Sequence, residues 1–329
     1  MKVQVPKAKK ISLPNISERR QVHILNPKSG RQSYYEAAKS AIEKSGGEIM
    51  TSEHPGQITE LVCELFTHDP FAHAIIYGGD GTVYEAVNGI MQSGKNATAS
   101  FSVIPSGSGN DFSSYMNDSG TFNKAELVPL DLIETRCGDK IRYCANVMNM
   151  GFDSDVVRET YSLKKIPFFR GPAGYVTSVA TTLMKKKTIP AKILMEGYCD
   201  NHGNPAEDPT RTFDQRILLT ACANSQFYGG GFHAAPIASV TDGLMDVLVV
   251  NNISRLRFVS LVKYYHDGTF ISEDGELLDQ FKKVLSYHKC RKITIDGPKF
   301  FCIDGEVLPT EGAPIEAEVM QNAVWFAAL

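Results

Sequence analysis

Short apolar runs alternate with helix-period patterns from residue 21 to about residue 105. The apolar runs predict strands at 22–25, 48–51, 72–77 and 101–104. Apolar residues at helical spacing predict amphipathic helices at 35–42, 58–66 and 83–91. Strands that take turns with helices are typical of βαβ units and a parallel sheet. This half of the chain is therefore predicted to be α/β.

After about residue 130 the pattern changes to β-type segments. Strands are predicted at 128–133, 143–149, 191–198, 213–223, 244–250, 291–295 and 300–304. Helical spacing persists only at 175–184 and 254–265. The predicted organisation has three parts: a loose basic tail over 1–20, an α/β domain over 21–130 and a β-rich domain over 131–329.

Composition narrows the class of protein. A chain of 329 residues suits two domains, and a net charge of −3 with 22% charged residues does not indicate nucleic acid as a partner. Seven cysteines without a CxxC pair fit neither a disulfide framework nor a zinc site, so a cytoplasmic location is expected. No apolar run approaches the roughly 18 residues of a membrane span, so any membrane contact is expected to be peripheral and transient.

The residues at 78–82 form a glycine-rich turn between a predicted strand and a predicted helix. Such a turn lies at the carboxyl end of a parallel strand, where free backbone N–H groups and the helix dipole favour a phosphate. Three glycines in four positions let the backbone approach that phosphate closely. A carboxylate there, Asp80, suits a magnesium ion held beside the phosphate. An ordinary Gly-Asp-Gly turn is the alternative.

Two further turns are predicted at the same sheet edge. Residues 26–30 follow the first strand with the sequence NPKSG, and residues 105–112 follow the fourth with PSGSGNDF. Each alone has the composition of any loop. The chain has no GxxxxGK[ST] pattern, so bound ATP would need another phosphate cradle.

These three turns together resemble the diacylglycerol kinase catalytic-domain family of lipid kinases. The match is to its soluble bacterial members, which are related to sphingosine and ceramide kinases, although Ser108 stands where those enzymes often carry threonine. The resemblance implies a nucleotide-binding α/β domain like that of NAD kinases, followed by a β-sandwich whose last strands return to the first domain. It also implies ATP contacts from Asn26, Pro27, Lys28, Ser29, Gly30, Thr51, Gly79, Asp80, Gly81, Thr82, Glu85 and Ser108.

A second block, from Gly229–Gly231 to the DGLMD sequence at 242–246, reads from sequence as a loop and a tight turn between strands. It also resembles the lipid-kinase segment that holds a structural magnesium. On that resemblance the ion would be bound by the Asp242 carboxylate and the carbonyls of Ser239 and Leu244.

The third block is the DGE sequence at 304–306, which alone could be a plain turn. Lipid kinases carry DGE near the carboxyl end, facing the transferred phosphate. The resemblance therefore implies Asp304 and Glu306 as candidates for receiving the acceptor's proton, with Asp80 completing the catalytic set. Asp131 is a looser candidate for linking metal, water and phosphate, because on a strand it could simply face outward.

The implied activity is in-line transfer of the ATP γ-phosphoryl group, with Mg²⁺, to a lipid hydroxyl. Diacylglycerol, giving phosphatidic acid, is the leading acceptor. The alternatives are an NAD kinase-like enzyme, which shares GGDGT, and a nucleotide-binding regulator without turnover. The basic and apolar residues at 164–170 and the lysines at 185–187 are candidate membrane contacts. Related enzymes are often dimers, which admits a homodimer.

Overall fold

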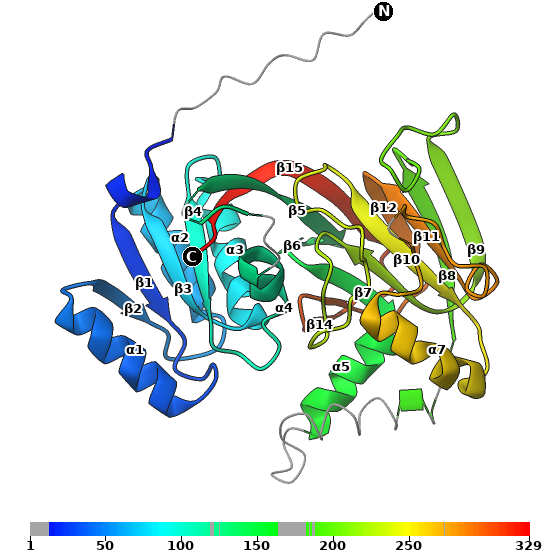
Figure 1. Cartoon of the computed structure of the whole chain (residues 1–329), viewed down its shortest axis with the longest axis horizontal. Helices are drawn as coiled ribbons and strands as arrows, with labels where there is room; N and C mark the ends of the chain where they lie inside the picture. The colour runs from blue at the N-terminus through cyan, green and yellow to red at the C-terminus, as the bar shows by residue number, and fades with distance from the viewer. Residues whose placement is uncertain are drawn as a thin grey trace, which may run out of the picture.

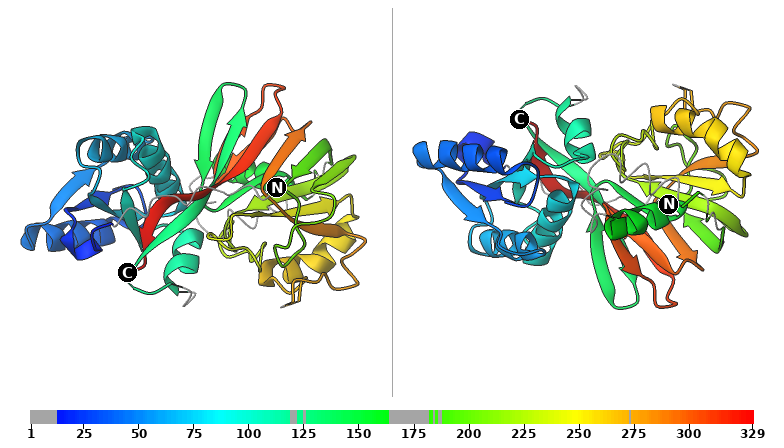
Figure 2. Two further views of the ribbon diagram at one scale, coloured as in Figure 1. Left: turned by 90° about the horizontal axis from the view of Figure 1, so that it is seen from above. Right: turned by 90° about the horizontal axis from the view of Figure 1, so that it is seen from below.

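The computed structural model describes residues 13–118, 122–124, 126–163, 182–183, 185, 188–272 and 274–329. Two lobes lie side by side, an α/β lobe and a β-rich lobe, and the last strand, β15 (Ile315–Ala327), runs from the second back to the first (Figure 1). The views from above and below show that this strand and β5 (Leu127–Cys137) span the junction between the lobes (Figure 2).

The α/β lobe alternates strands and helices as the sequence pattern predicts. Its strands are β1 (Gln21–Leu25), β2 (Glu48–Thr51), β3 (His73–Gly78) and β4 (Ser100–Pro105). Its helices are η1 (Ile16–Glu18), α1 (Gln32–Lys44), α2 (Gln57–His68), α3 (Asp80–Ser93), the short α4 (Asp111–Ser113) and the π-helical turn η2 (Ser114–Asp118).

The four strands are parallel, in the order β4-β3-β1-β2, and their carboxyl ends are aligned. Leu25 pairs with Thr51 on one side and Tyr77 on the other, while Gly78 pairs with Pro105. Strands β3 and β4 are buried along most of their length, as strands covered on both faces should be. Every loop that follows a strand therefore opens at one edge of the sheet.

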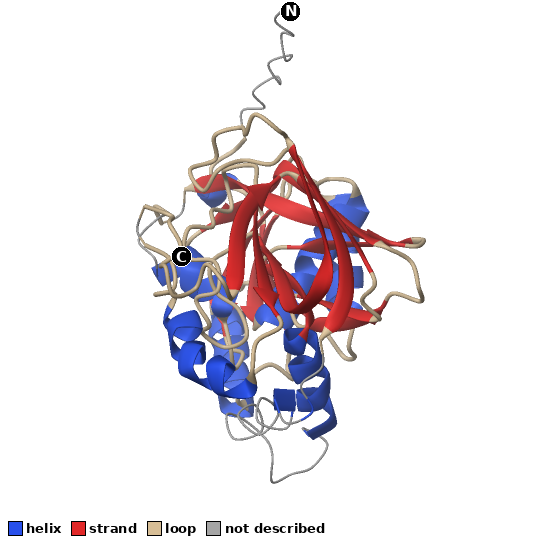
Figure 3. Ribbon diagram, turned by 90° about the vertical axis from the view of Figure 1, so that its right-hand side faces the viewer, coloured by secondary structure: helices blue, strands red, loops and turns tan. Residues whose placement is uncertain are grey.

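The β-rich lobe is built mainly from antiparallel strands. Besides β5 and β15 these are β6 (Lys140–Cys144), β7 (Val147–Gly151), β8 (Ile189–Glu196), β9 (Thr210–Ala223), β10 (Met245–Asn251), β11 (Leu285–Cys290), β12 (Lys292–Asp296), β13 (Phe300–Ile303) and β14 (Glu306–Pro309). Two longer helices belong to the described part of this lobe, α5 (Phe152–Leu163) and α7 (Arg255–Asp267). With this lobe facing the viewer, the strands lie above and helices gather below them (Figure 3).

One continuous sheet joins the lobes. Strand β15 pairs antiparallel with β5 and β12 and then, past a bulge between Met320 and Val324, runs parallel to β4 at Trp325 and Phe326. The Ser102 hydroxyl also donates to the Ala327 carbonyl at 2.7 Å. The predicted fold class, a parallel-sheet α/β domain followed by a β-sandwich-like domain, is confirmed.

One predicted strand is wrong. The segment 143–149 is two strands, because β6 ends at Cys144 and β7 begins at Val147. The backbone N–H groups of Ala145 and Asn146 turn away from the ladder to bind the carboxylate of Asp304. A residue distant in sequence therefore breaks the strand, which periodicity cannot predict.

Several predicted features lie outside the described residues. They are most of the basic tail, the candidate membrane segment 164–170, two of the lysines at 185–187 and most of the predicted helix 175–184. None of the described helices is long and apolar enough to cross a membrane.

Candidate active site

The three loops predicted to meet at the sheet edge are in contact. The amide Nδ2 of Asn26, just after β1, donates to the Thr82 hydroxyl in the first turn of α3 at 3.0 Å. The hydroxyl of Ser106, just after β4, donates to the Ser29 hydroxyl at 3.2 Å. Each loop is thus fixed by a neighbour that follows a different strand.

Glycine is required at the closest approaches. A Cβ on Gly79 would lie 2.8 Å from the Cα of Gly107, and a Cβ on Gly30 would lie 2.0 Å from the Ser106 carbonyl oxygen. Gly30 also has a φ of +77°, which disfavours other residues. The missing side chains let the loops after β1 and β4 and the turn before α3 pack closely together, at a helix N-terminus of the kind that suits a phosphate group.

Asp80 is the first residue of α3, and its carboxylate organises the loop after β4. Its Oδ1 accepts the N–H of Phe112 at 3.1 Å. The neighbouring Asp111 is buried and accepts the N–H groups of Gly230 at 2.8 Å and Gly231 at 2.7 Å. Burial and the charge of Asp80 raise the pKa of Asp111 to about 6, against the effect of these two donors. Asp111 therefore joins the nucleotide turn to the triple-glycine loop of the second lobe.

Thr51 and Glu85, two of the residues expected to contact ATP, differ in their surroundings. Thr51 ends β2 beside Leu25, at the same edge as the glycine turn. Glu85 lies one turn into α3, where its two carboxylate oxygens accept the N–H groups of Gly56 at 3.1 Å and Ile58 at 3.2 Å. Glu85 thus caps the N-terminus of α2, a structural task that the resemblance did not indicate.

The helix that begins at Asp80 leads to the second lobe. On α3, the amide of Asn88 donates to the Tyr143 carbonyl at 3.0 Å and accepts the Tyr143 N–H at 3.1 Å. Tyr143 lies on β6, immediately before the turn that binds Asp304. Helix α3 therefore begins at the nucleotide turn and is also hydrogen-bonded to the strand that leads into the Asp304-binding turn.

The carboxylate of Asp304 is buried in a nest of backbone donors. Its oxygens accept N–H groups from Ala145 at 2.8 Å, Asn146 at 3.0 Å and Val147 at 2.9 Å, and the Cys144 thiol at 3.2 Å. Burial raises the pKa of Asp304 to about 6, while these donors act in the opposite direction. Asp304 also has a φ of +47°, a strained conformation for a residue with a side chain.

Glu306 has a different environment from Asp304. It begins β14, and it is exposed. Its charge helps to raise the pKa of Glu85, although burial is the larger cause. Burial also raises the pKa of Tyr84, to which the charges of Asp304 and Glu306 contribute while Arg142 opposes. The charges of the DGE turn therefore lie near enough to α3 to act on Tyr84 and Glu85, and Glu306 is the exposed carboxylate of that turn.

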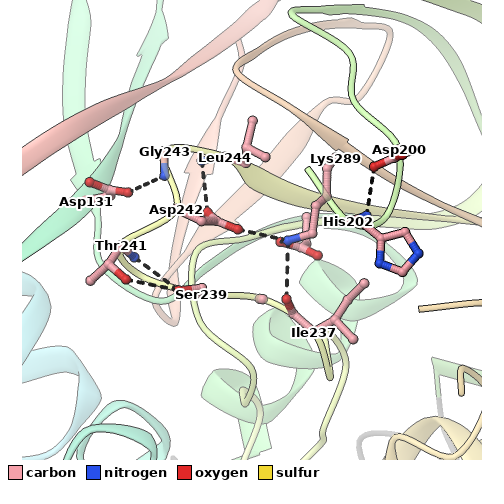
Figure 4. Close-up of polar contacts among 12 residues, drawn as sticks. Asp131, Asp200, His202, Ile237, Ser239, Thr241, Asp242, Gly243, Leu244 and Lys289 are labelled. Atoms are coloured by element: carbon pink, nitrogen blue, oxygen red, sulfur yellow. Dashed lines mark hydrogen bonds and ion pairs between the residues drawn. The ribbon is translucent and has the colours of Figure 1, made fainter. Parts of the chain in front are cut away.

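The DGLMD turn holds a cation of the chain itself (Figure 4). The ammonium of Lys289 donates to Asp242 at 3.0 Å, to Asp246 at 2.8 Å and to the Ile237 carbonyl at 3.2 Å. The Lys289 side chain is only 4% exposed. Burial lowers its pKa, but the charges of Asp246 and Asp242 outweigh burial and raise the pKa above its ordinary value.

These residues do not fit the implied structural magnesium. One Asp242 oxygen is paired with Lys289, and the other accepts the N–H of Leu244 at 3.0 Å. Among the described residues, no group of three or more His, Cys, Asp or Glu side chains could hold a metal. The positive charge that a magnesium ion would bring to Asp242 is already supplied by Lys289.

Asp131 is an internal anchor, not an outward-facing strand residue. It is buried and accepts the N–H of Gly243 at 2.7 Å and the N–H of Asn322 at 2.8 Å. Asn322 lies in the bulge of β15 with a φ of +52°. Asp131 therefore ties the DGLMD turn to the strand that joins the lobes.

The sequence analysis did not single out three of these residues: Asn88, Asp111 and Lys289. Asp111 lies inside a recognised turn, and as the acid of that turn it could be considered together with Asp80. Asn88 and Lys289 follow ordinary helix and strand patterns. Their partners come from other lobes or strands, so only the tertiary structure reveals them.

The geometry defines a two-lobe protein with an α/β lobe and a β-sandwich-like lobe, and comparisons with known proteins give its family. The diacylglycerol kinase catalytic domain model matches residues 20–138, and the model of the YegS C-terminal NAD kinase beta sandwich-like domain matches residues 146–327. The chain belongs to the diacylglycerol kinase catalytic-domain family of lipid kinases.

Full-length relatives are similar across both lobes. A Shewanella frigidimarina protein named "Probable lipid kinase YegS-like" is 26% identical over 315 residues, covering 92% of each chain. Human sphingosine kinase 1 is 22% identical over 353 residues, covering 93% of this chain and 90% of its own. A diacylglycerol kinase structure from Bacillus anthracis shares the fold with a TM-score of 0.61 at 19% identity, covering 94% of this chain and 97% of its own.

Proposed function

We propose that this lipid kinase transfers the γ-phosphoryl group of ATP to the hydroxyl of diacylglycerol, giving phosphatidic acid. One observation carries the proposal. A single helix, α3, begins at the glycine turn suited to phosphate and is hydrogen-bonded through Asn88 to Tyr143 of β6. The backbone that follows β6 binds Asp304, two residues before the exposed Glu306. Phosphoryl transfer needs this pairing of a phosphate cradle with an acceptor-side carboxylate.

In the proposed mechanism the phosphates of ATP lie against the N-terminus of α3 and the loops at 26–30 and 106–110. Backbone N–H groups of the glycine turn stabilise the charge that spreads over the transferred group. Mg²⁺ bound with ATP would neutralise phosphate charge. Asp80 would hold this ion, because it is the first residue of α3, directly after Gly79, and a carboxylate oxygen is a ligand that Mg²⁺ prefers.

Glu306 is assigned to the acceptor hydroxyl. It is exposed, whereas the carboxylate of Asp304 is enclosed by four donors. Asp304 shapes the turn that presents Glu306, and Glu306 takes the proton as the new O–P bond forms. Because the transition state is loose, a carboxylate is basic enough to accept this proton late.

The test is transfer of labelled phosphate from ATP to micellar diacylglycerol, sphingosine, phosphatidylglycerol and monoacylglycerol, with NAD as a further acceptor. We expect labelled diacylglycerol, and about 100-fold slower turnover in Glu306→Gln. Glu316→Gln, an exposed glutamate on β15, is the matched control and should keep full activity.

Label in another lipid alone would overturn the assignment of diacylglycerol. Label in NAD alone would assign an NAD kinase-like activity instead. ATP binding without transfer to any acceptor would leave a nucleotide-binding regulator.

A further inference from the structure

Helix α7 has an exposed apolar face. Leu256 is 85% exposed and is the most exposed large apolar side chain of the described residues, while Val259, one turn later, is 58% exposed and Tyr264 39%. Surface helices ordinarily bury such residues and expose polar ones. The helix lies at the outer edge of the β-rich lobe (gold in Figures 1 and 2).

Basic residues flank this face. Arg255, Arg257 and Lys263 are exposed on the same helix, and no acidic residue occurs in α7 before its last position, Asp267. A helix with apolar residues and cationic neighbours at its surface is suited to the boundary between water and anionic phospholipid.

The opposite side of α7 contacts the candidate active site. The Tyr265 hydroxyl lies 2.5 Å from that of Tyr228, and the rings of Tyr265 and Phe232 are 5.8 Å apart. Tyr228 and Phe232 flank the glycine loop whose Gly230 and Gly231 N–H groups bind Asp111. One helix therefore connects an exposed apolar face to a loop held beside Asp80.

We propose that the outer face of α7, centred on Leu256 and Val259, docks on the surface of an anionic phospholipid membrane. The apolar side chains enter the headgroup boundary, and Arg255, Arg257 and Lys263 pair with lipid phosphates. The reason for docking rests on the proposed function, because an acceptor such as diacylglycerol is reached only at a membrane.

The test is co-sedimentation of the full chain with vesicles of phosphatidylcholine and phosphatidylglycerol, compared with vesicles of phosphatidylcholine alone. We expect binding to the anionic vesicles that weakens when salt rises from about 0.1 to about 0.5 M. The double variant Leu256→Gln with Val259→Gln should bind at least about tenfold more weakly, because both apolar side chains lose their transfer free energy. Phe71→Gln is the matched control, since Phe71 is 46% exposed on the other lobe.

Equal vesicle binding by the wild type and the double variant, or no binding by either, would overturn the proposal. A wild-type dimer that the double variant converts to a monomer would assign the face to a second copy of the chain instead. Vesicle binding is measured without ATP, so it does not depend on phosphate transfer. Phosphorylation of vesicle lipid at equal rates by both proteins would reject α7 docking and leave the kinase assignment in place.

Discussion

Asn88 on α3 forms two hydrogen bonds with the backbone of Tyr143 on β6, donating to its carbonyl at 3.0 Å and accepting its N–H at 3.1 Å. The pair fastens the helix that begins at the nucleotide turn to the strand that precedes the Asp304 nest. This buried amide therefore helps to set the distance between the ATP side and the acceptor side of the site.

Removing that amide should affect both stability and activity. In Asn88→Ala the Tyr143 N–H and carbonyl lose their partner inside the protein, so the free energy of unfolding should fall by about 1–3 kcal/mol. Because α3 is then less firmly placed against β6, phosphate transfer at saturating ATP should also slow. Urea unfolding and steady-state kinetics measure the two effects.

Asn123→Ala is the control for Asn88→Ala, because Asn123 is exposed and its side chain bonds only Glu126 among the described contacts. It should leave stability and turnover close to wild type. A variant at Asn88 with unchanged stability would show that the two bonds do not hold the lobes together.

Asp304→Asn should mainly lower the stability of the protein, whereas Glu306→Gln should mainly lower its turnover. The amide introduced by Asp304→Asn would direct N–H donors at a nest of backbone N–H groups, so we expect a loss of about 2–4 kcal/mol in the free energy of unfolding. Glu306→Gln should unfold like the wild type and lose turnover, because Glu306 is exposed. Thermal unfolding of both variants, measured beside their ATP affinity, separates the roles. If Glu306→Gln proved the less stable of the two, this division of labour would be wrong.

Removal of divalent metal should leave the folded protein intact. The Lys289 ammonium already pairs with both Asp242 and Asp246, so EDTA and Mg²⁺ should give the same Tm in the absence of nucleotide. Lys289→Met leaves two carboxylates without their cation, and we expect a loss of about 3–5 kcal/mol in the free energy of unfolding. In that variant Mg²⁺ should raise Tm, because the ion can replace the lost charge.

Lys282→Met is the matched control for Lys289→Met. Lys282 also forms a lysine–aspartate pair, with Asp279 at 2.8 Å, but at the surface. It should change Tm little, with or without Mg²⁺. A wild-type protein that loses stability in EDTA would show that a metal, and not Lys289, holds the DGLMD turn.

The sequence predicts most of the fold because its signals are local. The alternation of β1 to β4 with helices and the glycine turn at 78–82 are each set within a few residues. The family resemblance extends the prediction to the fold of the second lobe and to the position of the DGE segment. The parallel register then explains why loops at 26–30 and 106–110 meet the turn at Gly79.

What sequence could not predict depends on distant partners. The break between β6 and β7 exists because Asp304, more than 150 residues later, binds the turn. Glu85 was assigned to ATP, yet its carboxylate caps α2. Asp242 lies in the expected motif, but the cation paired with its carboxylate is the ammonium of Lys289 on β11. In each case the sequence motif identifies the residue, but only the tertiary structure shows which charged groups and hydrogen-bond partners surround it.

His73 should make the protein less stable in acid. Its ring is fully buried on β3, with its nitrogens 2.9 Å from the hydroxyls of Ser100 and Ser102. Burial, with the charge of Arg19, lowers the pKa of His73 to about 3. In the unfolded chain the pKa returns to about 6.5, so below that pH the unfolded state binds a proton that the folded state excludes. Stability from neutral His73 is therefore lost as pH falls from about 6.5 toward 3.

The measurement is the difference in free energy of unfolding between the wild type and His73→Gln, whose amide can still bond both hydroxyls. Buried acids titrate in both proteins and cancel in that difference. Between about pH 7.5 and about pH 5 the wild type should lose about 2 kcal/mol relative to the variant, since one pKa unit corresponds to about 1.4 kcal/mol. A difference that stays constant over that whole range would mean that His73 accepts its proton in the folded protein.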